Sequence, residues 1–545
     1  MKKSSQNPIQ KKAPAGEQIK TIPAKERISD ALFAYILTGV YFVIVLIGIL
    51  HHEMWRDEYQ AWLIARNSHS VSDLFANFKY EGHPFLWFFI LYVINIFTSD
   101  IFYMQLIHII VAAATVYLVL RYAPFSRFHK LLFPFGYFLL FEYALISRNY
   151  VLCIFFAVLL CVLFRDVRKN IFYIAAVFIL LANSTIFGVI LSLSFGLYLL
   201  YDIFIENQHY LQDRVFIRNI AIAALLVLVG IVFSIWQIMP EPDNGFPVAK
   251  HTKIEMLWFK NVLLRLLVAY FPLPAFDPAS KIEFWNKSML FYGVNIGDAT
   301  FNMLFYLASA AALIFLFLVR TRIQVVWLYV SGTLMLLAYY YYTHLLFFRY
   351  TGCLFVILMA SSWLFFGLEK NRKSASATAK MLLNIYLSIV LLVHVIAGIM
   401  AYSKDIKYTF SNMQELGAYI VDNGYADEFI FGSCDYTVSP LSQYTDKPIY
   451  FPEYGRALKF MVWNSEKKWY PPINEILQDA AKQIQPGRDS ILMILNAGLT
   501  FSQTGKLVEY GPINDTIAMT LIKACNKKHI CGYEEFFVYR VKKRK

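Results

Sequence analysis

Charged residues are scarce in this chain. Of its 545 residues only 16% are Asp, Glu, Lys or Arg, whereas 58% are hydrophobic. This composition excludes a soluble globular protein, because too few polar side chains remain to cover its surface. Apolar runs long enough to cross about 30 Å of hydrocarbon recur, and in that environment only helices close all their backbone hydrogen bonds within one segment. The sequence therefore predicts a polytopic α-helical membrane protein.

The apolar runs predict about twelve membrane spans, within a range of 11–13. They cover residues 31–50, 84–98, 101–121, 131–147, 149–164, 171–184, 186–205, 219–239, 301–319, 323–342, 344–366 and 380–401. The basic loops at 121–130 and 165–170 both favour the cytoplasm, which requires that one span be missed or miscounted. The segment 262–274 is a candidate for the missing element, as a thirteenth span or as a helix in the membrane interface.

A signal-peptide cleavage pattern is also lacking. The first apolar run is full length, starts late and is not followed by small residues, so we expect a signal anchor behind a cytoplasmic basic tail of residues 1–30. The formal charge is +13. Because the basic residues are spread over this tail, short loops and the end of the chain, we expect membrane lipids as partners and no nucleic acid.

Cysteine is scarce too, with six residues in the chain. Cys153, Cys161 and Cys353 lie in apolar runs and are expected to be small buried side chains. Cys525 and Cys531 lie in the polar tail, where an oxidising compartment would let them close a short loop, but their spacing does not establish the pairing.

Two long segments are not membrane-like, namely the outer loop 240–300 and the tail 402–545. The tail opens with the amphipathic stretch MQELGAYIVDNG and continues with the β-type runs EFIFGS, KPIYF, SILMIL and FFVYRV. It predicts a soluble α/β domain behind a membrane domain of residues 31–401. The tail lacks a nucleophile triad, a phosphate-binding glycine loop and metal-ligand spacing, so we expect it to recognise an acceptor or to stabilise the protein.

The first outer loop, residues 51–83, carries the acidic residues of greatest interest. Asp57 and Glu58 follow the first span, and a carboxylate at the boundary of water and lipid becomes a better base or requires a cation. The competing interpretation is an interfacial salt-bridge network with Arg56 and Arg66.

A second acidic point is the sequence Glu81-Gly82-His83-Pro84, in which proline is well placed to start a helix. Glu81 is then either functional or a carboxylate favoured by the helix N-terminus, and His83 either a ligand or an interfacial imidazole.

Together these features resemble a known family. An Asp-Glu pair in the first outer loop, followed by an E-x-H-P turn into a span that reads WFFILY, is similar to the GT-C superfamily of integral-membrane glycosyltransferases. More specifically, it resembles the bacterial members related to protein O-mannosyltransferases and to the aminoarabinose transferase of lipid A. The runs SRNYVL at 147–152 and FRYTG at 348–352 resemble two later family motifs. The resemblance extends over residues 30–400.

The resemblance implies transfer of a sugar from a polyprenyl-phosphate donor, with inversion, on the outer side of the cytoplasmic (inner) membrane. The acceptor would be an extracytoplasmic protein, lipid or envelope glycan, and the C-terminal domain would face the same side. Asp57 matches the position of the family's catalytic base, and Glu58 is the second member of the pair.

Further site residues follow from the same resemblance. Glu81 matches a position that in some relatives holds a divalent cation or the donor phosphate, together with a later histidine, for which His251 is the candidate here. A divalent metal is therefore a candidate cofactor, although the family does not always use one, and the competing interpretation of His251, an exposed loop histidine, is the favoured one. Arg148 and Arg349 are candidates for binding the donor phosphate, with snorkelling to lipid headgroups as the alternative.

Two functions of other classes remain open. One is a transporter or flippase of lipid-linked saccharides, and the other is a membrane-anchored binding or assembly subunit. The chain lacks an internal repeat of the kind found in transporters with two related halves, and its acids cluster in an outer loop rather than along a pathway. Both observations favour an enzyme.

Overall fold

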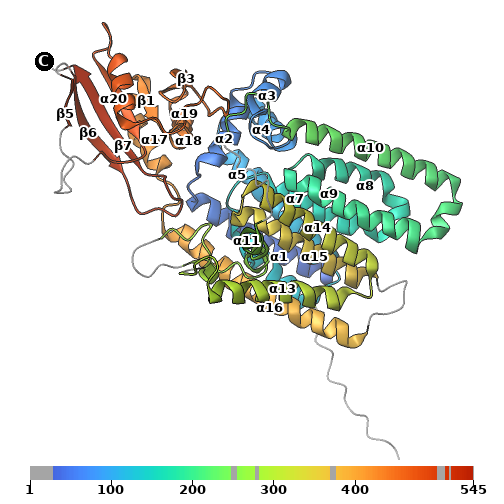
Figure 1. Ribbon diagram of the computed structural model, residues 1–545. Helices are drawn as coiled ribbons and strands as arrows, with labels where there is room; N and C mark the ends of the chain where they lie inside the picture. The colour runs from blue at the N-terminus through green and yellow to red at the C-terminus, as the bar shows by residue number, and fades with distance from the viewer. Residues whose placement is uncertain are drawn as a thin grey trace, which may run out of the picture.

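The protein consists of a helical bundle with an α/β domain at one end (Figure 1). The computed structural model describes residues 29–246, 255–275, 282–291, 293–368, 376–499, 510–514 and 517–543. Within these residues, nine helical stretches are long and apolar enough to cross a membrane, as expected of a multi-pass membrane protein.

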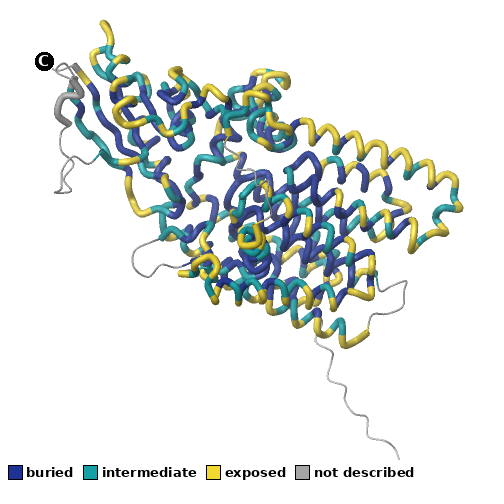
Figure 2. Tube along the Cα trace, in the orientation of Figure 1, coloured by how far each residue is buried: buried dark blue, intermediate teal, exposed yellow. Residues whose placement is uncertain are grey.

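The long helices of the bundle pack side by side around a buried core. They are α1 (Asp30–His51), α5 (Phe102–Tyr122), α7 (Tyr150–Leu163), α8 (Val167–Ala182), α9 (Ile186–Tyr201), α10 (Arg214–Ile238), α13 (Ala299–Val319), α14 (Ile323–Thr343), α15 (Phe348–Gly367) and α16 (Ala377–Lys407). Helices α7 and α8 form a hairpin, because Asn149 before α7 donates to the carbonyl oxygen of Ser184 beyond α8 at 3.0 Å. Figure 2 shows that α10 is exposed along most of its length, on the outside of the bundle.

Shorter helices complete the bundle. They are α2 (Arg56–Arg66), α3 (Val71–Phe78), α4 (Phe85–Phe97), α6 (Arg127–Leu132), α11 (Met256–Leu263) and α12 (Arg265–Tyr270), with single turns η1 (Phe133–Phe135), η2 (Phe138–Glu142), η3 (Phe164–Asp166), η4 (Asp202–Glu206), η5 (Gln208–Gln212) and η6 (Met289–Phe291). The predicted missing span at 262–274 is divided between α11, α12 and the residues after them. Neither helix is long enough to cross a bilayer.

The bundle has two distinct ends. We call the end that contacts the C-terminal domain the domain end, and the opposite end, where Arg127 pairs with Asp30 at 2.7 Å, the far end. The Arg165 guanidinium lies 5.9 Å from the centre of the Tyr122 ring. The loops at 121–130 and 165–170 therefore lie at the same end, as their charges require.

Helix α4 accounts for the miscounted span. Its 13 residues extend about 20 Å, too little to cross the hydrocarbon. At its start the backbone nitrogen of Leu86 donates to the carbonyl of Asn183 at 3.3 Å, and just beyond its end the carbonyl of Ser99 accepts from Gln443 of the C-terminal domain at 3.5 Å. Both ends of α4 thus lie at the domain end, and the prediction of a span at 84–98 was wrong.

The segment 131–147 does pass from the far end to the domain end, but not as the predicted helix. It consists of the end of α6, the turn η1, the π-helical turn η2 and irregular backbone. Pro134 and Gly136 interrupt helical hydrogen bonding early in this segment. Most of its residues are buried within the bundle, where irregular backbone is tolerated because protein groups, not lipid, surround it.

The C-terminal domain is built on a seven-stranded sheet with the strand order β3-β2-β1-β4-β7-β6-β5. Strand β1 pairs in parallel with β2 and β4, and the other pairs are antiparallel. The strands are β1 (Ile430–Ser433), β2 (Ile449–Phe451), β3 (Arg456–Leu458), β4 (Ser490–Leu495), β5 (Tyr510–Asn514), β6 (Ile517–Cys525) and β7 (Phe536–Lys543).

Helices cover both faces of this sheet. They are α17 (Met413–Asp422), α18 (Asp435–Val438), α19 (Ser442–Thr445) and α20 (Ile473–Lys482), with the turns η8 (Tyr425–Asp427) and η9 (Ser439–Leu441). Alternate residues of β1 and β4 pack toward α17 on one face and toward α20 on the other. The four predicted β-type runs and the predicted first helix are confirmed. Cys525 and Cys531 are both buried and free, so the possible bridge between them is not formed.

Candidate active site

Helix α2 carries the candidate catalytic residues and lies between the bundle and the C-terminal domain. The hydroxyl groups of Tyr59 and Tyr444 are 2.7 Å apart, and the indole nitrogen of Trp62 donates to Gln443 at 3.0 Å. Eight of its eleven residues are buried, which is why an apparently interfacial helix holds a fixed position.

Asp57 and Glu58 do not face the same surroundings. Successive residues on a helix point about 100° apart, so adjacent side chains reach different neighbours. The Asp57 side chain is 27% exposed and faces two arginines, whereas the Glu58 side chain is fully buried beneath α2.

Arg148 and Arg349 converge on Asp57. One carboxylate oxygen of Asp57 lies 3.4 Å from Nη2 of Arg349 and 3.9 Å from Nη1 of Arg148. The same Nη1 donates to the backbone carbonyl of Asp57. The structure therefore brings together three residues that are distant in the sequence and that the motifs had singled out.

Both guanidinium groups retain unused donors. Each arginine is only 8% exposed, yet Nε of Arg148 and both Nε and Nη1 of Arg349 have no hydrogen-bond partner among the described residues. The Arg349 guanidinium also lies 5.1 Å from the centre of the Trp55 ring and 5.0 Å from that of Tyr350. A buried guanidinium with free N–H groups is suited to receive an anion such as phosphate.

The charge of the site changes the acidity of Asp57. Burial raises the pKa of this carboxyl, but the positive charges of Arg148 and Arg349 outweigh burial and lower its pKa below the ordinary value. Asp57 is therefore ionised at neutral pH. It is also a weak base for as long as both arginines are directed at it alone.

Glu81 lies beside this group. Its carboxylate accepts from the Gln60 amide at 2.7 Å, and the same amide donates to the backbone carbonyl of Met461 in the C-terminal domain at 2.8 Å. Burial raises the pKa of Glu81 to about 7, against the smaller opposing effects of Gln60 and Arg148. Gln60 thus links Glu81, α2 and the domain above it.

His83 completes the turn after Glu81. Nη2 of Arg148 is 3.4 Å from Nε2 of His83, and burial together with the two arginines lowers the pKa of His83 to about 3. The imidazole is therefore neutral. Because Nε2 faces a donor and accepts, the proton resides on Nδ1, which is buried and has no partner in the described part of the chain.

Arg56 and Arg66 do not form the interfacial salt-bridge network with Asp57 and Glu58 that was the competing interpretation. Arg56 pairs with the buried Glu534 at 3.3 Å, and Arg66 pairs with Asp446 at 3.4 Å. Both arginines thus attach α2 to the C-terminal domain. Glu58 is instead hydrogen-bonded to groups of the bundle.

A metal ion fits this site poorly. Among the described residues no three His, Cys, Asp or Glu side chains form a group that could hold one. Glu81 lies within the electrostatic range of the Arg148 guanidinium, whose positive charge disfavours a cation. His251 lies outside the described residues. We derive no chemical step through a metal.

Three residues of the site were not predicted from the sequence. Gln60 lies three residues after Asp57, and residues with this spacing are neighbours on the same face of a helix. His52 and Asp405 lie at the ends of the first and last apolar runs, and their contact joins positions 353 residues apart in the sequence. Polar residues at span ends are the only signal that the sequence offers for them.

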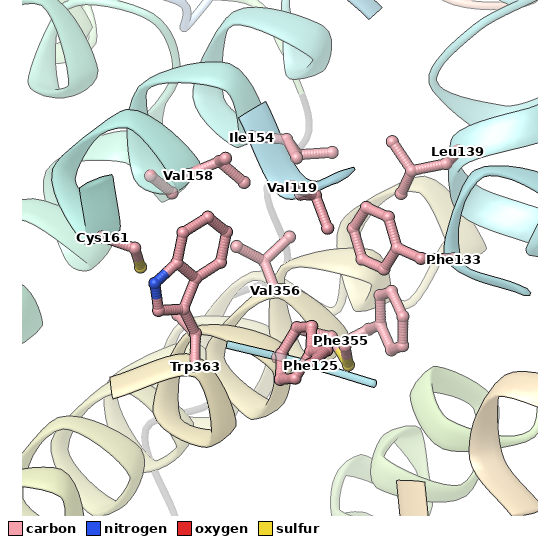
Figure 3. Close-up of a pocket in the computed structure, with 13 residues that line it drawn as sticks. Val119, Phe125, Phe133, Leu139, Ile154, Val158, Cys161, Phe355, Val356 and Trp363 are labelled. Atoms are coloured by element: carbon pink, nitrogen blue, oxygen red, sulfur yellow. The ribbon is translucent and has the colours of Figure 1, made fainter. Parts of the chain in front are cut away.

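A small apolar pocket of about 20 Å³ lies inside the bundle (Figure 3). Its lining includes Val119 of α5, Ile154 and Val158 of α7, and Phe355 and Trp363 of α15. The pocket has no catalytic group. It does lie on α15, the helix that carries Arg349 at its domain end.

Comparisons with known proteins provide no assignment for this site, because no protein-family model matches the chain and no curated protein matches it.

Proposed function

We propose that the protein is a membrane glycosyltransferase of the GT-C type, which moves a sugar from a polyprenyl-phosphate donor to an extracytoplasmic acceptor with inversion. One observation carries the proposal. Two buried guanidinium groups with free N–H donors converge on a partly exposed carboxylate at the end of an apolar bundle. Guanidinium groups bind phosphate and carboxylate through paired N–H donors, and the donors that Asp57 leaves free can receive a phosphate.

The chemistry follows from this arrangement. The phosphate of the donor lies against Arg148 and Arg349, and the acceptor hydroxyl approaches the opposite face of the sugar. As the bond from acceptor oxygen to anomeric carbon forms, the bond from that carbon to the phosphate oxygen breaks and the phosphate leaves with the electron pair. The hydroxyl proton passes to Asp57. Both arginines stabilise the charge that develops on the leaving phosphate.

Donor binding also changes Asp57 itself. In the free protein the arginines lower the basicity of Asp57. A bound phosphate brings negative charge to the same guanidinium groups and so offsets their effect on the carboxylate. Asp57 therefore becomes a better base when the donor is in place, so that proton transfer from the acceptor is coupled to donor binding.

The apolar pocket lies on the helix that carries Arg349. Phe355, which lines it, follows Arg349 by six residues on α15, a rise of about 9 Å. The pocket is too small for an isoprenoid tail, which we place in the lipid around the bundle. We assign the neutral Nδ1–H of His83 to hydrogen bonding with the donor.

The orientation follows from charge. Arg127, Lys130, Arg165 and Lys169 lie at the far end of the bundle, which by the positive-inside rule is cytoplasmic. The candidate site and the C-terminal domain then face the outside of an inner membrane.

The test compares the wild-type protein with Asp57→Asn and with Asp73→Asn. Asp73 is an exposed carboxylate on α3, in the same outer segment, and serves as the matched control. Detergent-solubilised proteins are incubated with isotope-labelled polyprenyl-phosphate sugars and membrane extract, and the label is followed by mass spectrometry. We expect Asp57→Asn to reduce transfer by about 10²–10⁴-fold at unchanged abundance, and Asp73→Asn to have no effect.

Retained transfer by Asp57→Asn would refute the role of this residue. Absence of transfer by the wild-type protein from a full donor panel would refute the proposed reaction and favour transport or binding. Transfer in detergent counts against transport, because detergent abolishes the two sides of a membrane.

A further inference from the structure

A buried imidazole connects α1, α2 and α16 beneath the candidate site. His52 directs Nδ1 at Asp405, with distances of 3.0 and 3.2 Å to its two oxygens, and Nε2 at Glu58 at 3.2 Å. All three side chains are fully buried or nearly so. The ring also packs on Phe410, with 4.6 Å between centres.

The protonation of His52 follows from its partners. Carboxylate oxygens only accept hydrogen bonds, so a ring that faces a carboxylate at each nitrogen carries a proton on both. The two carboxylates outweigh burial and raise the pKa of His52 to about 10. The group is thus an imidazolium between two carboxylates.

Glu58 uses its remaining acceptor capacity on backbone. One oxygen accepts from the backbone nitrogen of Ser147 at 2.6 Å, and the other accepts from that of Trp55 at 3.1 Å. Ser147 directly precedes Arg148, and Trp55 directly precedes α2. Glu58 therefore fixes the backbone at both places from which the reacting groups extend.

The connection between these two places runs in both directions. Glu58 holds the backbone before Arg148, and the Arg148 side chain holds the backbone carbonyl of Asp57. Two adjacent residues of α2 are thus tied to two adjacent residues before α7. A change at Glu58 therefore alters the position of Arg148 relative to Asp57.

We propose that Glu58, His52 and Asp405 are positioning residues that set the geometry of Asp57 relative to Arg148 and tie it to the last helix of the bundle. Neither Glu58 nor Asp405 reaches the substrate. The inference deepens the proposed function and rests on it for its kinetic readout. Its binding readout does not require turnover.

The experiment uses Glu58→Gln, Asp405→Asn and the double variant in the full-length protein. A misplacement of about 1 Å between reacting groups is enough to lower kcat about 100-fold, and we expect a loss of this size for Glu58→Gln with an unchanged KM for the acceptor. We also expect polyprenyl phosphate to bind about tenfold more weakly to Glu58→Gln, because Arg148 is displaced. Because Asp405 acts on this geometry only through His52 and Glu58, the double variant should lose no more activity or affinity than Glu58→Gln alone.

His129→Gln is the matched control. His129 is also a buried imidazole with one side-chain partner, Ser388 at 2.9 Å, but it lies at the far end of the bundle. The variant His129→Gln should leave kcat and the affinity for polyprenyl phosphate unchanged. An equal loss in this variant would show that disturbing any buried side-chain hydrogen bond of the bundle has such an effect, and it would overturn the proposal.

The remaining outcomes are also decisive. Wild-type kcat and affinity in Glu58→Gln would overturn the positioning role, and so would additive losses in the double variant. If Glu58→Gln does not accumulate, Asp405→Asn alone supplies the same two measurements, since Asp405 does not contact the backbone at Ser147. A wild-type protein that binds polyprenyl phosphate but transfers nothing would refute the proposed function, and the binding arm would still decide the positioning role.

Discussion

Glu81 differs from Asp57 in the direction of its pKa shift, although both carboxyl groups lie near Arg148. Asp57 is flanked by two guanidinium groups and its pKa is lowered, whereas Glu81 is hydrogen-bonded to a neutral amide and burial raises its pKa to about 7. At neutral pH the site therefore holds one ionised carboxylate and one carboxyl that is half protonated. The second group makes donor binding sensitive to pH.

We expect the affinity for a polyprenyl-phosphate sugar to fall as the pH rises through about 7. Deprotonation of Glu81 adds a negative charge beside the phosphate site, and a like charge at this range weakens binding by about tenfold. The donor is a phosphodiester of constant charge, and neutral His83, with a pKa of about 3, does not titrate here. Equilibrium binding to the purified protein between pH 5.5 and pH 8.5 measures the effect.

Glu81→Gln provides the control, because its amide does not titrate and its affinity should be independent of pH. An unchanged pH dependence in this variant would contradict the assignment. The titration would then belong to another buried carboxyl group, such as Glu53, Glu453 or Glu534, whose pKa values are also raised to about 7 by burial.

The sequence predicts those residues of the candidate site that belong to short motifs. Five residues chosen from the sequence, Asp57, Glu81, His83, Arg148 and Arg349, lie together at the domain end. The contrast between Asp57 and Glu58 was not predictable, because it depends on which neighbours each side chain meets across the fold. The partners His52 and Asp405 are 353 residues apart in the sequence, and no local pattern joins them.

At the scale of elements, α2 depends on two partners. Its hydrophobic residues pack on the bundle, while Trp62 and Tyr59 contact the C-terminal domain. A helix of eleven residues is too short to be stable alone in water. Its position, and that of Asp57, is therefore a property of the packing on both sides.

Trp62→Ala tests this dependence. Trp62 is fully buried, so the substitution should lower the free energy of unfolding by about 3–5 kcal/mol and lower the Tm in detergent, followed by circular dichroism. The control is Trp327→Ala on α14, where the tryptophan is 49% exposed and little stability should be lost. Equal Tm values for wild type and Trp62→Ala would contradict the packing role of α2.

The elements differ in how well hydrophobicity predicts them. The apolar runs for α1, α5, α10, α13 and α14 became long helices, because these segments are uninterrupted. The runs at 84–98 and 131–147 are equally apolar, but one is too short to cross and the other is interrupted by proline and glycine. Hydrophobicity reports burial, and it does not distinguish burial in lipid from burial in protein.

At the scale of the whole molecule, charge is divided between the two ends. Basic residues of the loops at 121–130 and 165–170 gather at the far end, whereas the acidic residues of the site lie at the domain end. This division makes the orientation of the proposed membrane protein testable without any assay of activity.

We expect Lys468→Cys to react with a membrane-impermeant maleimide in intact cells, and Lys169→Cys to react only after permeabilisation. Both lysines are exposed, at the domain end and the far end respectively. Wild-type protein is the background control, since five of its cysteines are buried and Cys434 is only partly exposed. Labelling of Lys169→Cys alone in intact cells would reverse the proposed orientation.

The pairing of Arg56 with Glu534 has a consequence for synthesis of the protein. The two residues are 478 positions apart, which at about 5–20 residues per second corresponds to roughly 24–96 s of translation. During that interval the first outer segment is already made, while the groups that hold it in place do not yet exist. A chain released early would therefore carry every candidate catalytic residue and still have no working site.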